Sequence, residues 1–137
     1  MSTYDVYSTD KSLEEEGTWI TLVDGSEWKI SRASSQRSQK ARRNAEKPHR
    51  STLQRAERMG EPVPQNVDDE INMEWMVNGI VLGWKGVTGP NGEELEFNES
   101  NMRMIFSDLP DLMLEVVRAS GDISNFRQQE AEEEGKS

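Results

Sequence analysis

One apolar stripe in the second half of the chain constrains the fold more than any other feature. Its residues recur at the spacing i, i+3, i+4, i+7, i+8 and i+11, and they are Met73, Met76, Val77, Ile80, Val81 and Trp84. This spacing is typical of a helix with one buried face. Three neighbouring apolar residues widen that face: Ile71, Trp75 and Leu82. We therefore predict a central core helix that begins near Asp68 and continues through Trp84.

The residues after this stripe predict a short hairpin followed by two helices. The turn-forming sequence Gly89-Pro90-Asn91-Gly92 separates two short apolar segments and predicts a hairpin over residues 84–97. Asn98 is placed to cap one helix, and Pro110 starts another, which Gly121 ends. The apolar residues expected on the inner faces of these helices are Met102, Ile105, Phe106, Leu112, Met113, Val116 and Val117.

A further hairpin is predicted near the N-terminus, because Asp24-Gly25 separates two alternating segments within residues 17–31. Asp-Gly is the preferred two-residue turn of a type I′ hairpin, in which both central residues take positive φ. The cross-strand pairs in that register are Val23–Ser26, Thr21–Trp28 and Trp19–Ile30. One face of the hairpin would then be buried against the rest of the molecule, and it would carry Trp19, Thr21, Val23, Trp28 and Ile30.

Composition limits the chain to one small core. Of its 137 residues 33% are hydrophobic, yet four Trp and the periodic apolar segments indicate that part of it folds. The sequence predicts a small α+β protein: an N-terminal β-hairpin, then a mainly helical domain with a short second hairpin. The expected segments are a flexible N-terminus (1–16), the hairpin (17–31), a basic helical segment with a Pro linker (32–65), a helical core domain (66–127) and an acidic flexible tail (128–137). The sequence favours two helical pieces within 32–65, joined at Lys47-Pro48.

Cysteine is absent, which excludes disulfides, thiolate metal sites and cysteine nucleophiles. The first ten residues lack the basic and apolar regions of a secretion signal. No stretch approaches the roughly 20 apolar residues of a membrane-spanning helix. We therefore expect no membrane contact and a location in the cytoplasm of the cell that makes the protein.

Charge is sorted along the chain, whose net charge is -10. Residues 1–31 carry -5, residues 32–58 carry +7 and residues 59–137 carry -12. The bases of the middle segment are Arg32, Arg37, Lys40, Arg42, Arg43, Lys47, Arg50, Arg55 and Arg58. Such segregation favours attraction between the basic segment and the acidic remainder, within one chain or between copies. We expect self-association.

A catalytic, cofactor or metal site is not predicted, so we expect the protein not to be an enzyme. His49 is the only histidine, and we interpret it as a solvated residue in an exposed loop. The acids Asp68, Asp69 and Glu70 suit the dipole at a helix N-terminus better than a cation site. The glycine-rich stretch 86–92 lacks the Lys-Ser/Thr pair of a phosphate-binding loop, and Pro90 removes a backbone donor.

The basic segment 32–58 is also a candidate nucleic-acid arm. Nine bases in this segment could neutralise several phosphates and give salt-dependent binding. However, the segment contains no aromatic residue to stack on bases, and the whole chain is acidic. We favour a protein contact or a solvated face, and keep nucleic acid as the alternative.

Four Trp and seven Met exceed what a core of this size can enclose. Exposed Met side chains adapt to varied partners. We expect Trp75, Met102 and Met104 to be partly exposed and available to a partner. Trp84 is a fourth candidate, although its position at the end of the stripe favours the core.

The order of these features resembles the tail assembly chaperones of long-tailed phages. The shared succession is a Gly83-Trp84 segment, a Gly-containing turn, the Phe97-Asn98-Glu99 helix start, the Asp108-Leu109-Pro110 helix start and Asn125-Phe126 before an acidic end. The resemblance covers residues 17–130, and residues 75–126 best. It implies a protein that coats the tape measure protein, keeps it soluble in the host cytoplasm, helps to recruit tail tube subunits and is absent from the finished particle.

Many members of that family also exist as a longer form made by a -1 ribosomal frameshift. The sequence Glu134-Gly135-Lys136 can be encoded with a slippery heptamer, G GGA AAG. Two alternatives stay open beside the chaperone. One is a structural tail or head-tail joining protein, and the other is a small nucleic-acid-binding regulator that uses residues 32–58.

Overall fold

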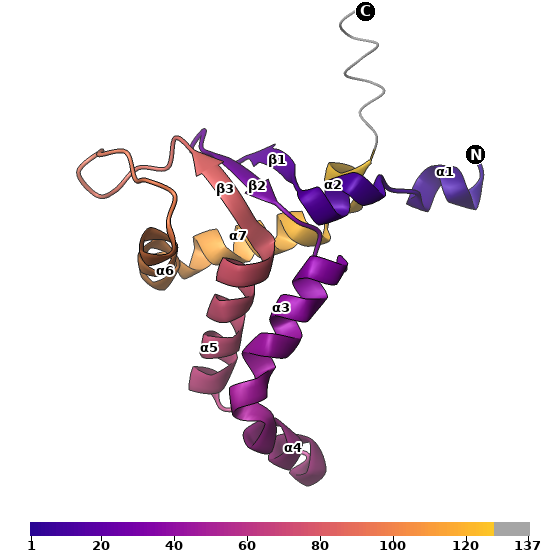
Figure 1. Cartoon of the computed structure of the whole chain (residues 1–137), viewed down its shortest axis with the longest axis vertical. Helices are drawn as coiled ribbons and strands as arrows, with labels where there is room; N and C mark the ends of the chain where they lie inside the picture. Colours follow the sequence, from indigo (N-terminus) through magenta and orange to yellow (C-terminus); the bar gives the residue numbers. More distant parts are fainter. Residues whose placement is uncertain (128–137) are drawn as a thin grey trace, which may run out of the picture.

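The computed structural model describes residues 1–127 of the chain (Figure 1). In chain order the elements are α1 (Thr3–Tyr7), α2 (Lys11–Glu16), β1 (Thr18–Thr21), β2 (Glu27–Ile30), α3 (Gln36–Glu46), the 3-10 turn η1 (Lys47–His49), α4 (Arg50–Met59), α5 (Gln65–Trp75), the π-helical turn η2 (Met76–Ile80), β3 (Val81–Lys85), α6 (Glu99–Asp108), α7 (Pro110–Gly121) and the 3-10 turn η3 (Ile123–Phe126). This mixed α+β architecture confirms the predicted fold class. The predicted acidic tail and the frameshift sequence lie outside the described residues.

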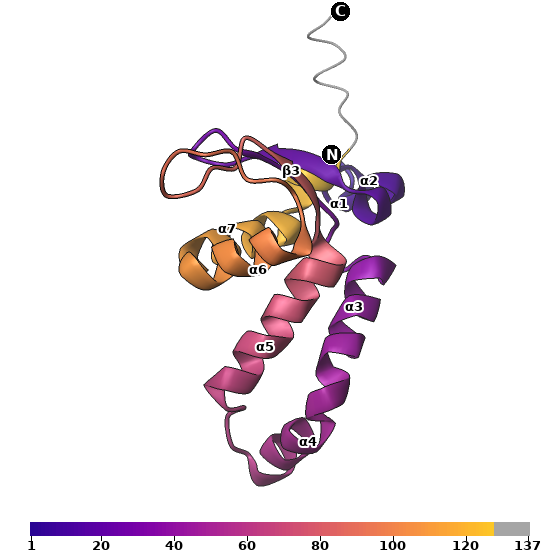
Figure 2. The ribbon, with the colours of Figure 1, turned by 60° about the vertical axis from the view of Figure 1, so that its left-hand side comes forward.

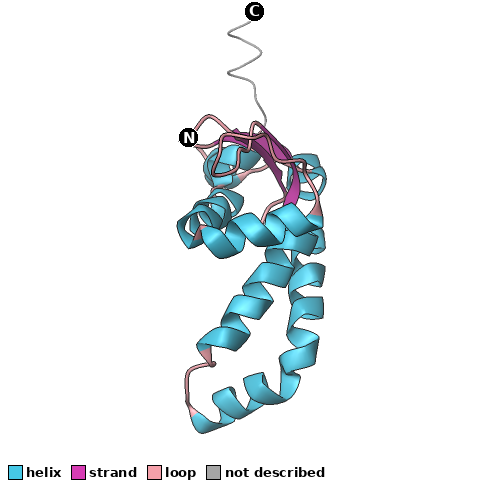
Figure 3. Cartoon of the chain, turned by 90° about the vertical axis from the view of Figure 1, so that its left-hand side faces the viewer, coloured by secondary structure: helices cyan, strands magenta, loops and turns pink. Residues whose placement is uncertain are grey.

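The molecule has a body and a projecting helical arm. β1, β2 and β3 form an antiparallel sheet in that order, and α6 and α7 lie together on one side of it (Figure 2). α3 and α5 run away from the sheet side by side and carry α4 at their far end (Figures 1 and 3). The main core lies in the body, and its most buried large side chains are Trp28, Ile30, Met76, Ile80, Phe106, Val116 and Phe126.

The predicted register of the N-terminal hairpin is wrong by one residue. The paired residues are Thr18–Ile30, Trp19–Lys29, Ile20–Trp28 and Thr21–Glu27. The reason is a three-residue loop, in which the Leu22 N–H donates to Ser26 O at 2.9 Å and the Gly25 N–H donates to Leu22 O at 2.9 Å. Gly25 takes a φ of 88°, as three-residue hairpin loops require at their last position.

The shifted register changes which residues reach the core. A slip of one residue moves every side chain of a strand to the opposite face. Trp28 and Ile30 are buried as predicted, but Trp19, Thr21 and Val23 are exposed. Their places on the inner face are taken by Thr18 and Ile20, which lie opposite Ile30 and Trp28.

The core helix ends before Trp84, so the prediction that it continues to this residue is wrong. α5 passes into η2, and Val81 is already extended, with φ of -86° and ψ of 118°. β3 then pairs with β2, with Trp84 opposite Trp28. This pairing satisfies the backbone groups that β2 would otherwise expose at an edge. Val81 and Trp84 of β3 are apolar because they are buried in the sheet, and they are three residues apart. Their spacing therefore continues the apolar pattern of the preceding helix although these residues form a strand.

The predicted second hairpin is present as a turn with short pairing. Thr88 and Glu94 form a single bridge, and the Leu95 N–H donates to Val87 O at 2.8 Å. Further on, the predicted helix starts are confirmed. The Asn98 side chain accepts a hydrogen bond from the Asn101 N–H at 2.8 Å, and Pro110 is the first residue of α7.

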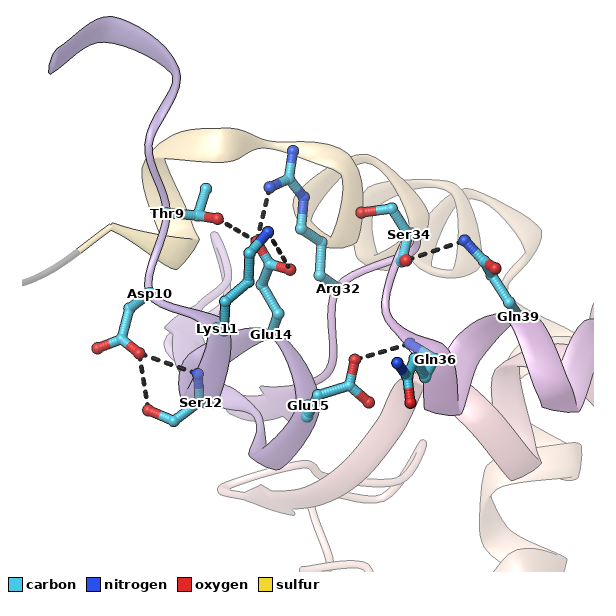
Figure 4. Close-up of polar contacts among 10 residues, drawn as sticks. All are labelled: Thr9, Asp10, Lys11, Ser12, Glu14, Glu15, Arg32, Ser34, Gln36 and Gln39. Atoms are coloured by element: carbon cyan, nitrogen blue, oxygen red, sulfur yellow. Dashed lines mark hydrogen bonds and ion pairs between the residues drawn. The ribbon is translucent and has the colours of Figure 1, made fainter. Parts of the chain in front are cut away.

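Residues 1–16, predicted to be flexible, form two short helices, and the second of them, α2, docks on the body. The Asp10 N–H donates to Phe126 O at 2.7 Å, which ties the start of α2 to η3. The Glu14 carboxylate of α2 is buried and accepts hydrogen bonds from the Thr9 hydroxyl and the Arg32 guanidinium (Figure 4). Burial by itself raises the pKa of Glu14, but these bonds outweigh it and hold that pKa below its ordinary value.

The next residue, Glu15, caps the arm. Its carboxylate accepts hydrogen bonds from the Gln36 N–H at 2.7 Å and the Arg37 N–H at 3.1 Å, the first amides of α3 (Figure 4 shows the first). A carboxylate at this position satisfies unpaired amides and complements the helix dipole. The N-terminal residues therefore hold the arm onto the body.

The arm has a small core of its own. Ala45, Val67 and Ile71 are buried between α3 and α5, with Leu53 and Val63 packed against them. The predicted break at Lys47-Pro48 is confirmed, since η1 separates α3 from α4. His49, expected to be solvated, has a side chain only 18% exposed, and its Nε2 lies 3.0 Å from the Glu70 carboxylate of α5.

Candidate functional site

The four predicted partner-binding residues have different surroundings. Met102 is buried in the core, so its predicted exposure is wrong. Trp75 is half-buried: its indole N–H donates to the Ser38 hydroxyl at 2.8 Å, and the Arg42 guanidinium lies 5.0 Å from its ring centroid. Trp84 is buried, as its place on the stripe indicates. Met104 alone among the four is exposed, at 42%.

Met104 belongs to a set of exposed apolar side chains within one stretch of chain, residues 97–114. Its other members are Phe97, Leu109 and Leu114, and Leu109 and Leu114 are 50% and 53% exposed. Two of these residues lie one helical turn from the neighbours of Leu109: Met104 from Asp108 on α6, and Leu114 from Pro110 on α7. We call these four apolar residues the α6–α7 surface.

The α6–α7 surface borders a hollow of about 430 Å³ beneath the tip of the N-terminal hairpin. Its apolar lining is Leu22, Val23, Leu109, Pro110 and Leu112. Its charged lining is acidic throughout: Asp24, Asp108, Asp111 and Glu115. Within residues 1–127, none of these four acids makes an ion pair. We call this hollow the acidic groove.

The predicted basic segment divides into bases held by the fold and bases that face solvent. Arg32 pairs with Glu14, Arg37 donates to Glu15, and Arg42 donates to Asn72 at 2.8 Å while covering Trp75. The remaining six are exposed: Lys40, Arg43, Lys47, Arg50, Arg55 and Arg58. Of the last five, Arg50, Arg55 and Arg58 lie on α4, and Arg43 and Lys47 lie beside it, together with one exposed acid of that helix, Glu57. No acid of residues 1–127 forms an ion pair with these five bases. We call these five the basic tip.

A larger hollow, of about 770 Å³, runs along the arm between α3 and α5, from Arg103 of α6 to Pro48 and His49 of η1. Its charges are mostly compensated from within. Arg103 Nη1 lies 2.6 Å from Glu74 Oε1, and His49 faces Glu70. Hydrogen bonds from Arg103 lower the pKa of Glu74 and so keep it ionised. This hollow is built mainly as a contact between elements of the chain itself.

Three exposed residues of these surfaces are not among the predicted partner-binding residues: Val23, Leu109 and Leu114. The predicted register places Val23 on a buried face, but it is 98% exposed at the hairpin tip. Leu114 does not share the spacing of the inner residues Leu112, Met113, Val116 and Val117, and this difference indicates that it points outward. Leu109 fits that spacing but lies just before α7, with φ of -127° and ψ of 76°, so the pattern does not reveal its exposure.

Among residues 1–127, no group of three or more His, Cys, Asp or Glu side chains could hold a metal ion. Nor is any helix in that range both long and apolar enough to cross a membrane.

The fold and its exposed surfaces thus define a small α+β protein with an acidic body, a basic helical tip and several exposed apolar side chains within residues 97–114. The model of the YdaY prophage protein family matches residues 33–137, and the chain belongs to this family of phage-derived proteins. Searches of curated proteins and of solved structures found no match.

Proposed function

We propose that this phage protein is a tail assembly chaperone, which binds the tape measure protein in the host cytoplasm and keeps it soluble while the tail is built. The observation that carries the proposal is the α6–α7 surface. Apolar side chains that stay half-exposed in the folded protein offer a partner area to bury. A flexible Met among them suits a partner of varied sequence.

The proposed activity is binding without catalysis. A tape measure protein is long and largely helical, so many copies of a weak binder can cover it, and their combined effect exceeds the affinity of one site. The order of elements in residues 75–126, which resembles the tail assembly chaperones, supports the identity of the partner. A longer frameshifted form that recruits the tail tube protein belongs to the same proposal.

Co-expression with the tape measure protein of the same prophage tests the proposal. We expect the wild-type chain to keep that protein in the soluble fraction and Met104→Ser/Leu114→Ser to lose this effect. Both side chains are exposed, so the variant should fold normally. Tyr4→Ser/Tyr7→Ser removes two exposed aromatic rings from α1 and is the matched control, which should remain active.

Two results would contradict the chaperone function. If the tape measure protein is equally soluble without this chain, the partner is wrong. If purified virions contain the chain, it is a structural tail or head-tail joining protein instead. DNA retention that falls with salt and is abolished by Arg50→Gln/Arg55→Gln would favour the nucleic-acid-binding regulator.

A further inference from the structure

The basic tip and the acidic groove are two unpaired surfaces of opposite charge on one molecule. The basic tip gathers five exposed bases around α4, and Met59 at the end of this helix is 57% exposed. The acidic groove combines an apolar floor with four acids. Each surface therefore offers what the other lacks: a cationic helix with a flexible apolar side chain, and an anionic hollow with an apolar lining.

Like charges gathered on one surface repel each other. A contact that brings in the opposite charge relieves this repulsion and favours both association and correct orientation. Within residues 1–127 neither surface obtains such a contact, because the ion pairs that the chain forms lie elsewhere.

The two surfaces cannot meet within one molecule. α4 lies at the far end of the arm, whereas the hairpin and the start of α7 belong to the body (Figures 1 and 2). The arm is held in this position by its packing of α3 on α5 and by the Glu15 cap at its base. The partner that the groove fits must therefore come from another molecule.

We propose that a second copy of this chain is that partner, and that the basic tip of one molecule docks in the acidic groove of the next. Met59 enters the apolar part of the groove, and the Arg side chains of α4 face Asp111 and Glu115. The occupant is identified by charge complementarity, since both halves of the contact are present in the same sequence. This inference does not depend on the tape measure protein.

The geometry of such a contact determines the kind of assembly. Different surfaces meet, so the contact is heterologous, and each added copy brings a free tip and a free groove. Contacts of this kind continue as open chains unless the rotation between copies closes a ring. Assembly should thus grow with protein concentration and weaken with salt, which screens the charges.

Sedimentation velocity of the purified full-length chain alone tests the proposal. At about 50 mM NaCl we expect the weight-average mass to rise with concentration, and at about 500 mM NaCl to fall toward the monomer. Arg55→Gln/Arg58→Gln (tip variant) and Asp111→Asn/Glu115→Gln (groove variant) should each weaken association roughly tenfold. The matched controls Lys40→Gln/Arg118→Gln and Glu94→Gln/Glu96→Gln remove the same charges from other exposed sites and should associate like wild type.

A mixture of the two variants provides the decisive measurement. The tip variant keeps an intact groove and the groove variant keeps an intact tip, so the mixture can form one wild-type contact and no more. We expect a 1:1 dimer that does not grow further. A monomer at every concentration and salt, an equal loss in the control variants, or a mixture that stays monomeric would each overturn the proposal. Because no tape measure protein is present, failure here would leave the chaperone function untouched.

Discussion

Trp84 connects strand β3 to the loop that follows it through contacts on two sides. Its ring meets Trp28 at 5.0 Å and Phe97 at 5.2 Å between centroids, both edge-on. Its indole N–H donates to Leu95 O at 2.9 Å. Edge-to-face aromatic pairs stabilise a fold by more than the burial of their surface area alone. Trp84 therefore holds the loop onto the sheet.

We expect Trp84→Ala to lower the free energy of unfolding by about 3–5 kcal/mol, because it leaves a large cavity and an unsatisfied carbonyl. Urea denaturation followed by circular dichroism measures this change. Trp19→Ala is the matched control, since Trp19 is 43% exposed and the Lys85 ammonium lies 4.4 Å from its ring centroid. Its cost should stay below about 1 kcal/mol, and similar costs at both sites would contradict the assignment of Trp84 to the core.

Glu14 should make the stability depend on pH. Its pKa in the folded protein is below the ordinary value of 4.5, so the stabilisation it provides is present above that value and is lost as the pH falls through the lower, folded pKa. Glu14→Gln should lower the free energy of unfolding by about 1–2 kcal/mol at pH 7 and flatten its decline below about pH 5. Thermal melts across this range measure both effects. Glu16→Gln, at an exposed neighbour, should behave like wild type.

At the scale of elements, η2 is where the arm meets the body. Gly79 of this turn lies against α3, and its carbonyl accepts a hydrogen bond from the Ser31 hydroxyl. A Cβ at residue 79 would lie 2.6 Å from Ala41 Cβ and 3.3 Å from Ser38 Cα. Neither neighbour can move aside by rotating a flexible side chain, so a larger residue has to push α3 away.

We therefore expect Gly79→Ala to destabilise the protein by about 1–3 kcal/mol through overpacking. Gly121→Ala, at the end of α7, meets no atom within 4 Å and should change stability little. Denaturant titrations of the two variants provide the comparison. An unchanged stability of Gly79→Ala would contradict the close packing of η2 against Ala41 of α3.

The sequence predicts best those elements whose start or end is determined by neighbouring residues. Asn98 and Pro110 act on their own helix starts, and both assignments hold. The hairpin register depends on one loop residue, because Gly25 serves a two-residue or a three-residue loop equally well. β3 depends on a distant partner, β2, which no local pattern reveals. The α6–α7 surface is predicted only in part, because the exposure of a side chain also depends on which distant elements pack over it.

At the scale of the whole molecule, stability should fall from the body to the tip. α4 contributes only Leu53 and Ala56 to buried contacts, whereas β2 lies in the middle of the sheet with Trp28 and Ile30 fully buried. Segments with few buried contacts open more often than the core. We expect amides of α4 to exchange with deuterium much faster than those of β2, measured by mass spectrometry of peptic peptides. Equal protection would show that the arm and the body unfold as one unit.

The arm is inserted between two neighbouring strands. β2 and β3 are antiparallel neighbours, which a tight turn can join, yet residues 31–80 stand between them. The part of this insertion near the sheet supplies Met76, Val77 and Ile80 to the main core. In its far part Ala45, Leu53, Val63, Val67 and Ile71 pack against one another in a separate cluster. If α3 and α5 each gained or lost one helical turn, the sheet would stay intact while α4 moved by about 5.4 Å. In a head-to-tail chain, the length of this insertion would determine the distance between successive copies.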